Sequence, residues 1–144
     1  MDQKHTQFRK ILVGFDGSRQ AEKATDTALT FAQALHCTVL VLAVARPPEP
    51  ATMVELDAML DDAREHFEES FKKITQRAKE LGVELETAVV VGHPVEQIVH
   101  RAEEDHVDLI VLGRRGVSRF EKFIIGSTSE KVLRYAHCPV MVVR

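Results

Sequence analysis

The sequence predicts one α/β domain in which an open, doubly wound sheet of five parallel strands, in the order 3-2-1-4-5, is covered by four helices. Two observations lead to this prediction. Short runs rich in β-branched residues alternate with longer segments whose apolar residues recur every three or four positions. Several of the short runs are also apolar at successive positions, which is typical of parallel strands buried on both faces. Because no linker or repeat interrupts the pattern, residues 1–144 are expected to form a single domain.

The five expected strands occupy residues 10–15, 38–45, 84–91, 107–112 and 139–143. The third alternates apolar and polar residues more than the others do, so it is expected at an edge of the sheet. Connections between parallel strands are right-handed and short, which favours the open doubly wound arrangement. In such a sheet ligands bind at the carboxyl ends of the strands, where the strand order reverses.

The first two expected helices are recognised by their apolar faces. In the first, Ser18 is placed to cap the start. Its apolar face is expected to contain Ala21, Ala24, Ala28, Phe31 and Leu35. The second helix is the longest, because its apolar residues follow one another in steps of three and four from Leu56 to Leu81, and Gly82 ends it.

The other two helices are recognised by their start signals. Pro94 suits the first position of the third helix, and Glu96 in the first turn is favourable to the helix dipole. The fourth helix is expected to begin at Ser127-Thr-Ser-Glu130, which fits a capping box. In that motif the Ser127 hydroxyl accepts a hydrogen bond from the Glu130 amide, and the Glu130 carboxylate accepts one from the Ser127 amide.

Composition and charge exclude several classes of protein. With 19 Lys and Arg against 22 Asp and Glu, the net charge is −3, so an extended positive surface for nucleic acid is not expected. The apolar runs are far shorter than the about 18 residues of a membrane span, so no membrane insertion is expected. The polar first ten residues carry no secretion signal, and the expected location is the cytoplasm. The two cysteines, Cys37 and Cys138, have no zinc-site spacing and lie on strands too far apart for a disulfide.

The loop after the fourth strand, residues 113–125, combines glycines with positive charge. Four basic residues and one acidic residue give it a charge of +3 in a chain whose net charge is −3. Gly113 and Gly116 let backbone amides approach a ligand, while Gly126 and Ser127 stand at the start of a helix, where a phosphate is favoured. The alternative is that these glycines only turn a long loop and that Ser127 only caps a helix.

The spacing Gly113-x2-Gly116-x9-Gly126-Ser127 resembles the nucleotide-binding signature of the universal stress protein family, in the branch that binds ATP. The resemblance covers nearly the whole chain, and residues 46–69 are the least similar stretch. It extends to the segments Ile11-Leu-Val-Gly-Phe-Asp16-Gly-Ser18, Gly92-His-Pro94, Asp108-Leu-Ile-Val-Leu-Gly113 and Gly126-Ser-Thr-Ser-Glu-Lys-Val-Leu-Arg-Tyr-Ala-His-Cys-Pro139-Val-Met-Val-Val143.

The resemblance implies an adenine-nucleotide α-hydrolase-like fold with ATP lying across the carboxyl edge of the sheet. The ATP-binding residues that it implies are Asp16, Val44, Gly113, Arg114, Gly116, Gly126, Ser127 and Thr128. The phosphates are then expected on the backbone of the glycines and Ser127. Asp16 is expected near the ribose or a phosphate-bound Mg2+, and the main chain of Val44 is expected beside the adenine.

Two residues at this edge have competing interpretations. Asp16 either binds ribose or metal, or only forms the turn between a strand and a helix. His93 either contacts the nucleotide or stands in solvent at the start of the third helix.

The sequence places no nucleophile and base together, so no catalytic residue is assigned and the expected activity is at most a slow ATPase. It lacks a P-loop, the third glycine of the dinucleotide fingerprint and a nucleophile elbow. One alternative is a dimeric protein-interaction module that binds no nucleotide. A second is an enzyme of the wider adenine-nucleotide α-hydrolase group, such as a pyrophosphatase, but the S-G-G-x-D-S loop of one such branch is replaced by G-F-D-G-S at residues 14–18.

The leading hypothesis is therefore an ATP-binding universal stress protein whose nucleotide state regulates a protein partner that the sequence does not identify. A homodimer is expected, because the last strand is short, apolar and at an edge. Pairing residues 140–143 with their copy would hide that edge.

Overall fold

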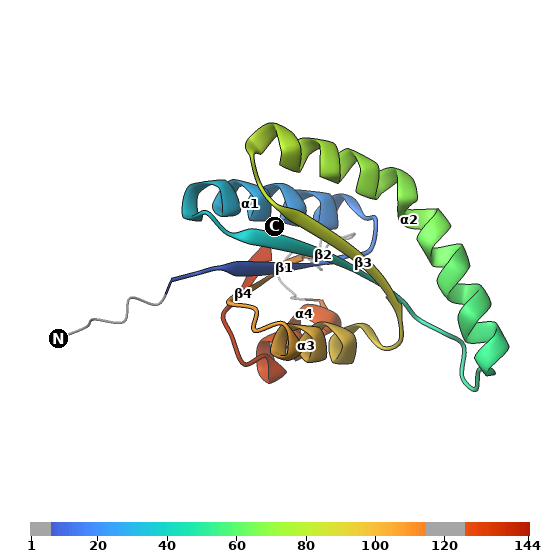
Figure 1. The fold of residues 1–144 in the computed structure, drawn as a ribbon. Coiled ribbons are helices and arrows are strands. Elements are labelled where there is room, and N and C mark those ends of the chain that lie inside the picture. Colours follow the sequence, from blue (N-terminus) through green and yellow to red (C-terminus); the bar gives the residue numbers. More distant parts are fainter. Residues whose placement is uncertain (1–6, 115–125) are drawn as a thin grey trace.

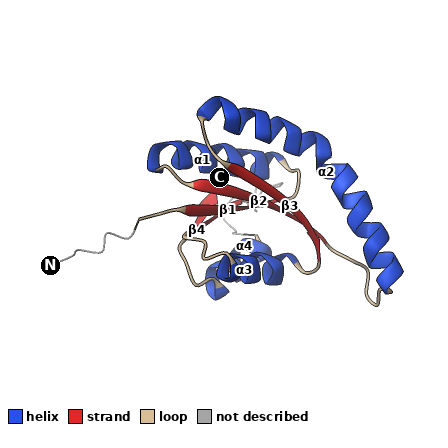
Figure 2. Cartoon of the chain, in the orientation of Figure 1, coloured by secondary structure: helices blue, strands red, loops and turns tan. Residues whose placement is uncertain are grey.

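The computed structural model describes residues 7–114 and 126–144 of the chain. Its elements follow one another in strict β–α alternation (Figures 1 and 2). They are β1 (Lys10–Phe15), α1 (Arg19–Leu35), β2 (Thr38–Ala45), α2 (Met53–Leu81), β3 (Leu85–Val91), α3 (Pro94–Glu104), β4 (Leu109–Gly113), α4 (Ser127–Tyr135) and β5 (Val140–Val143).

All the strands belong to one parallel sheet in the order β3-β2-β1-β4-β5. The predicted fold class and strand order are confirmed, and so is the prediction that the third strand lies at an edge. The order reverses between β1 and β4, because β2 and β3 follow on one side of β1 while β4 and β5 lie on the other. This reversal fixes where a ligand cleft is expected.

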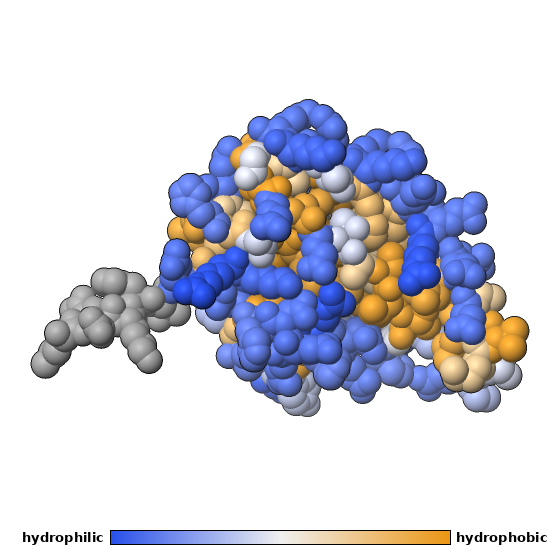
Figure 3. Space-filling model, in the orientation of Figure 1, coloured by the Kyte–Doolittle hydropathy of each residue, from blue (hydrophilic) through white to orange (hydrophobic). Residues whose placement is uncertain are grey.

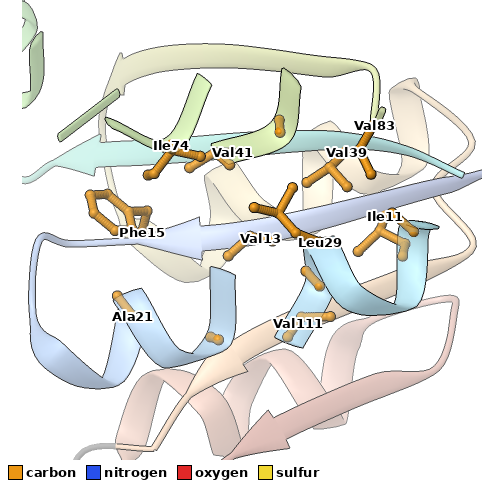
Figure 4. Close-up of a cluster of buried hydrophobic side chains, with 14 of the residues drawn as sticks. Ile11, Val13, Phe15, Ala21, Leu29, Val39, Val41, Ile74, Val83 and Val111 are labelled. Carbon is orange, nitrogen blue, oxygen red and sulfur yellow. The ribbon is translucent and has the colours of Figure 1, made fainter. Parts of the chain in front are cut away.

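The helices form one layer on each face of the sheet, with α1 and α2 on one face and α3 and α4 on the other (Figure 1). Each layer has its own apolar core, and neighbouring residues of one strand serve different cores. Ile11 packs beneath α1 and α2, whereas Leu12 packs beneath α3 and α4, and both side chains are fully buried. Figure 4 shows the first core, where Leu29 of α1 and Ile74 of α2 lie over the strands.

The buried face of α1 differs from the expected one. Phe31 and Leu35 were expected to face the core, but they are 38% and 42% exposed. Leu29 and Ala32 are buried instead, together with Ala28. Each residue turns a helix by about 100°, so Phe31 lies to one side of the face centred on Ala28 and Ala32. Leu35 is the last residue of α1, directly before the left-handed C-cap His36.

A capping box that the sequence analysis did not identify starts α2. The Glu55 amide donates to the Thr52 hydroxyl at 3.2 Å, and the Thr52 amide donates to the Glu55 carboxylate at 2.7 Å. The hydrogen bond from the Thr52 amide, and after it the Thr52 side chain, lowers the pKa of the Glu55 carboxyl, because both favour its charged form. The first turns of α2 extend past the sheet in Figure 1, and Met53 and Val54 there are 74% and 78% exposed.

Asp108 joins the start of β4 to the start of β1. Its carboxylate accepts hydrogen bonds from the amides of Arg9 at 2.8 Å and Lys10 at 3.0 Å. The expected strand began at residue 107, but β4 begins at Leu109, after the left-handed turn at His106 (φ 53°) and the junction made by Asp108. The chain is thereby aligned so that β1 and β4 end side by side.

Two exclusions made from the sequence concern thiols and membrane helices. Cys37 and Cys138 are both free thiols, as expected. Among the described helices, none is both long enough and apolar enough to cross a bilayer.

Candidate functional site

A cleft of about 310 Å³ lies where the strand order reverses, at the carboxyl ends of β1, β2 and β4. Its walls come from the β1–α1 turn, the end of β2, the start of α3 and the start of α4. The described residues that line it are Gly14, Phe15, Asp16, Ser18, Gln20, Ala21, Leu42, Val44, Arg46, Pro94, Ile98, Leu112, Gly113, Gly126, Ser127, Thr128 and Ser129. The predicted position of the site, at this edge of the sheet, therefore coincides with a cleft.

The turn from β1 to α1 is held by the two polar side chains that were singled out there. The Ser18 amide donates to Asp16 Oδ1 at 2.9 Å, and Gly17 between them has a φ of 83°, which favours glycine. The Ser18 hydroxyl accepts from the Ala21 amide at 3.1 Å, so Ser18 caps α1 as predicted. Asp16 is thus a turn former, and its exposed carboxylate also lines the cleft.

The main chain of Val44 faces the same cleft. Along β2 the backbone groups point alternately toward β1 and β3, and the Thr38 amide donates to Arg9 of the chain entering β1. Val44, six residues further, therefore points its carbonyl to the β1 side. The paired register of the two strands ends at Phe15 and Ala43. Hence the Val44 carbonyl lies beyond the last paired residue and is directed to the cleft.

The start of α4 presents amide groups to the cleft without a side-chain cap. Gly126 is the N-cap, Ser127 is the first helical residue, and the Glu130 amide donates to the Gly126 carbonyl at 2.9 Å. The predicted capping box is therefore wrong, because the helix itself uses the Glu130 amide. The amides of Ser127, Thr128 and Ser129 precede the first intrahelical donor, so they have no acceptor within the helix.

The two glycines that bracket the loop differ in what they require. A Cβ on Gly113 would lie 2.5 Å from the backbone carbon and oxygen of Gln20, so the close approach of β4 to α1 needs a glycine there. Gly126 has φ −56° and ψ 152°, a conformation that any residue adopts. The backbone conformation of Gly126 therefore does not explain why this lining position is a glycine.

The other sequence-predicted residues lie partly outside this cleft. Thr128 lines it, but Arg114 is not among the lining residues, and its amide donates to the Val143 carbonyl at 2.8 Å in the β4–β5 ladder. Gly116 lies outside the described residues, as do Arg115, Arg119 and Lys122 of the charged loop.

The cleft opens into a larger hollow of about 700 Å³ between α3 and α4, which we name the α3–α4 hollow. Arg46, Pro94, Ser127 and Thr128 line both spaces. His93 lines the hollow and places Nε2 at 2.7 Å from the Glu49 carboxylate, so it pairs with the β2–α2 loop at the start of α3. At the far end stands Tyr135, which is 61% exposed.

Sequence reasoning missed several lining residues that carry no motif, among them Leu42, Arg46 and Ile98. Leu42 and Ile98 form the apolar floor, and Arg46 adds a cation at the mouth. Arg46 follows the last residue of β2, and this position at a strand's carboxyl end was the signal that could have identified it. Within residues 7–114 and 126–144, no three His, Cys, Asp or Glu side chains are grouped as a metal site.

Comparison with known proteins identifies the family to which this arrangement belongs. The profile described as the universal stress protein family matches residues 7–144. The chain belongs to the universal stress protein family. Universal stress protein YxiE of Bacillus subtilis (strain 168) is 34% identical over 147 residues, covering 95% of this chain and 99% of that protein.

Solved universal stress protein structures share the fold. UspA from Lactobacillus plantarum superposes with a TM-score of 0.84 at 27% identity, covering 97% of this chain and 100% of that one. A universal stress protein crystallised in complex with cAMP superposes with a TM-score of 0.76 at 26% identity, covering 96% and 99% of the two chains. An adenine nucleotide is thus a ligand of at least one structural neighbour.

Proposed function

We propose that this universal stress protein binds an adenine nucleotide, with ATP as the expected ligand, in the cleft at the β1–β4 switch point, and that its nucleotide state regulates a protein partner. The uncapped start of α4 in the wall of the cleft is the observation that carries the proposal. Unpaired amides and the positive end of a helix dipole together favour a phosphate. The cAMP complex of a structural neighbour supports the same ligand class.

The phosphates are proposed to lie against Gly126, Ser127 and Thr128. The amides of Ser127 and Thr128 lack acceptors within the helix, and the Ser127 hydroxyl is not used as a cap. The absence of a side chain at Gly126 leaves room beside these donors. Gly113 supports the site indirectly by allowing the backbone of α1 to approach β4. Roles for Gly116 and Arg114 belong to the same proposal through the positively charged loop that follows β4.

The adenine is proposed to lie beside Val44, and this contact selects adenine over guanine. The Val44 carbonyl can accept a hydrogen bond from the exocyclic amino group of adenine. Guanine presents a carbonyl oxygen at the equivalent position, so two acceptors would face each other and one would lose its partner. Leu42 and Ile98 add apolar contact below the ring.

Asp16 is proposed to meet the ribose hydroxyls or a phosphate-bound Mg2+. Its Oδ1 accepts from Ser18, and the same exposed carboxylate lines the cleft. One carboxylate together with phosphate oxygens suits Mg2+, which usually keeps several waters and takes few protein ligands. Bound Mg2+ would supply neutralisation of phosphate charge.

The described lining favours binding over rapid chemistry. Asp16 is the one carboxylate in it, and it already forms the β1–α1 turn. Hydrolysis, if it occurs, would rest on positioning and electrostatics and would be slow.

The test is a calorimetric titration of Mg-ATP into protein stripped of co-purified nucleotide, with GTP and AMP as comparisons. We expect micromolar ATP binding and at least tenfold weaker GTP binding. No heat at several temperatures, after verified stripping, would refute the proposal and favour a dimeric interaction module without nucleotide.

Gly126→Val gives the matching test of the site. Valine fits the backbone at this position, but its side chain would occupy the proposed phosphate position, so ATP affinity should fall at least 100-fold with an unchanged far-UV spectrum. Gly92→Val is the control, because Gly92 lies outside the cleft and its Cβ would meet the movable Gln97 side chain. Parental ATP affinity in folded Gly126→Val protein would contradict the phosphate position.

A homodimer through β5 is part of the same proposal. The Ile110 amide donates to the Pro139 carbonyl and the Arg114 amide to the Val143 carbonyl, so the alternate residues Val140 and Val142 point their backbone groups away from β4. These outward groups can pair with a second copy across a two-fold axis.

A further inference from the structure

At the opposite edge of the sheet, a groove runs between α2 and β3, which we name the α2–β3 groove. It has a volume of about 730 Å³ and is distinct from the proposed nucleotide cleft. Its described lining is Arg64, Glu68, Phe71, Lys72, Thr75, Gln76, Lys79, Thr87, Ala88 and Val89. Figure 3 shows apolar surface where Figure 1 places β3 beneath α2.

The backbone edge of β3 is open toward this groove. The Val39 amide donates to the Glu84 carbonyl and the Gly92 amide donates to the Ala45 carbonyl, so the even-numbered residues of this segment point their backbone toward β2. The odd-numbered residues Leu85, Thr87, Val89 and Val91 therefore point their amides and carbonyls outward. Because β3 ends the sheet, the outward groups have no strand partner within the described chain.

The sequence of β3 gives this edge little protection, because its one charged residue, Glu86, pairs with Lys10 and Arg101. Natural edge strands are usually shortened, bulged, or interrupted by lysine or proline. β3 is seven residues long, reads LETAVVV and contains no lysine and no proline. Such an edge is a template for an added strand from another chain.

The wall of the groove is predominantly positive. Arg64, Lys72 and Lys79 stand on one stripe of α2, with Glu68 as the one carboxylate in the lining. Glu68 pairs with Lys72 at 3.5 Å, and Arg64 pairs with Asp61 outside the groove at 4.0 Å. From Arg64 to Lys79 the helix rises about 22 Å, close to the about 23 Å length of a seven-residue strand. The three cations are thus spread over a length of α2 comparable to that of β3, and the groove between them and the sheet is lined by Thr87, Ala88 and Val89.

We propose that the α2–β3 groove binds an extended acidic peptide segment of another protein, which adds to β3 as a sixth strand. Backbone pairing with the outward groups of Thr87 and Val89 supplies the register. Acidic side chains on the face toward α2 meet the cations, and small apolar side chains on the other face continue the sheet. The proposal is independent of nucleotide binding.

A second copy of the chain fits this groove less well. Two-fold pairing of two α2–β3 grooves would bring their cations together, because an isologous interface places the same patch on both sides. The like charges would oppose that pairing. Charge complementarity therefore favours an acidic partner.

The first experiment measures fluorescence anisotropy of a fluorescein-labelled, eight-residue peptide that alternates glutamate with valine or threonine. We expect saturable micromolar binding, at least tenfold weaker binding of the same peptide with lysine for glutamate, and weakening as salt rises from 50 to 300 mM. A lack of saturation at 1 mM peptide, or equal binding of the lysine peptide, would overturn the proposal.

Two N-methylated peptides test the strand pairing itself. Methyl groups on alternate amides block one edge of an added strand and leave the other edge intact. We therefore expect one methylation register to abolish binding and the other to preserve it. Equal effects of both registers would show that no strand is added to β3.

Charge reversal on α2 locates the site. Lys72→Glu with Lys79→Glu should weaken the peptide at least tenfold, while the control Lys23→Glu with Lys73→Glu keeps the same net charge and leaves binding within twofold. Lys73 is on α2 beside Lys72 but does not line the groove. Unchanged peptide binding by the Lys72→Glu, Lys79→Glu variant would overturn the proposal. A loss of self-association of this variant in sedimentation would also overturn it, because the groove would then bind a second copy of the chain.

Discussion

Gly113 and Gly126 stand at the two ends of the same loop, but the fold requires a glycine at only one of these positions. Gly113 is needed by the fold, because α1 passes where its side chain would stand. Gly126 is not needed by its backbone conformation. The sequence predicted a ligand contact for both glycines, because a glycine that admits a ligand and one that admits another helix look the same in a single sequence.

Replacing Gly113 by alanine tests this distinction at the level of one methyl group. The new Cβ would lie 2.5 Å from two backbone atoms of Gln20, so α1 or β4 must shift. We expect a loss of about 1–3 kcal/mol in the free energy of unfolding, as for other overpacked sites. Urea denaturation measures it. Gly92→Ala is the control, since its nearest contact is the movable Gln97 side chain, and equal losses in the two variants would contradict the prediction.

Among the elements, α3 is tied to β1 through one carboxylate. Asp105, the C-cap of α3, accepts from Arg101 Nε at 2.9 Å and from Lys10 Nζ at 3.1 Å. Hydrogen bonding to Arg101 lowers the pKa of the Asp105 carboxyl most, burial opposes the shift, and Lys10 lowers it further. The folded protein therefore holds the charged carboxylate more tightly than the unfolded chain does.

The pH dependence of this junction follows from linkage. Because the pKa of Asp105 is lower in the folded state, its carboxylate contributes to the free energy of unfolding. That contribution is complete above the unfolded pKa of about 3.9 and is lost as pH falls through the folded pKa. Asp105→Asn should lower the urea midpoint at pH 6. The difference in urea midpoint between the variant and the parent should be smaller near pH 3. Glu104→Gln, at an exposed pair with His100, should change little. A constant difference across this pH range would contradict the assignment.

At the other end of the sheet, β5 carries the dimer prediction. Met141 is partly buried against the α1–α2 core and stands on the edge strand. Met141→Glu places an unpaired charge in the expected interface, so the protein should sediment as a monomer. Met141→Leu keeps an apolar side chain and should remain dimeric. A folded Met141→Glu protein that sediments like the parent would rule out this interface.

Some features of the helices and strands could be predicted from the sequence, and others could not. The strand order followed from buried β-branched runs and right-handed crossovers, whose physics is local or topological. The start of α4 at Ser127 was predicted, but its cap was not, because Ser127-Thr-Ser-Glu130 satisfies a capping pattern while the preceding Gly126 is the N-cap. The α2–β3 groove was not foreseen, because it depends on how far α2 stands from β3.

At the scale of the whole molecule, nucleotide binding should raise the free energy of unfolding. A ligand that binds the native state at 100 times its dissociation constant stabilises it by about 2.7 kcal/mol. For a domain of this size, that corresponds to a rise of roughly 5–11 °C in Tm. Scanning calorimetry with Mg-ATP measures the rise, and Gly126→Val protein at the same ATP concentration should show almost none. Equal shifts in both proteins would place ATP elsewhere.

The position of the site at the whole-molecule scale was predictable, whereas its internal detail was not. Strand polarity alone predicts that Asp16, Val44 and Gly113 lie at one edge of the sheet. The direction of the Val44 carbonyl could be predicted only from the strand register, because β2 continues beyond its last residue paired with β1. The lining role of Arg46 and Ile98 required the packing of α3 against the sheet.

Tyr135 at the end of α4 gives the unlabelled protein an intrinsic fluorescence signal. The chain has one tyrosine and no tryptophan, so its near-ultraviolet emission comes from this ring. The ring is 61% exposed and borders the α3–α4 hollow, which shares four lining residues with the proposed nucleotide cleft. Emission intensity and its quenching by iodide therefore follow events at this corner of the molecule in unlabelled protein. An unfolding of the opposite, α2-covered face alone would leave that signal unchanged.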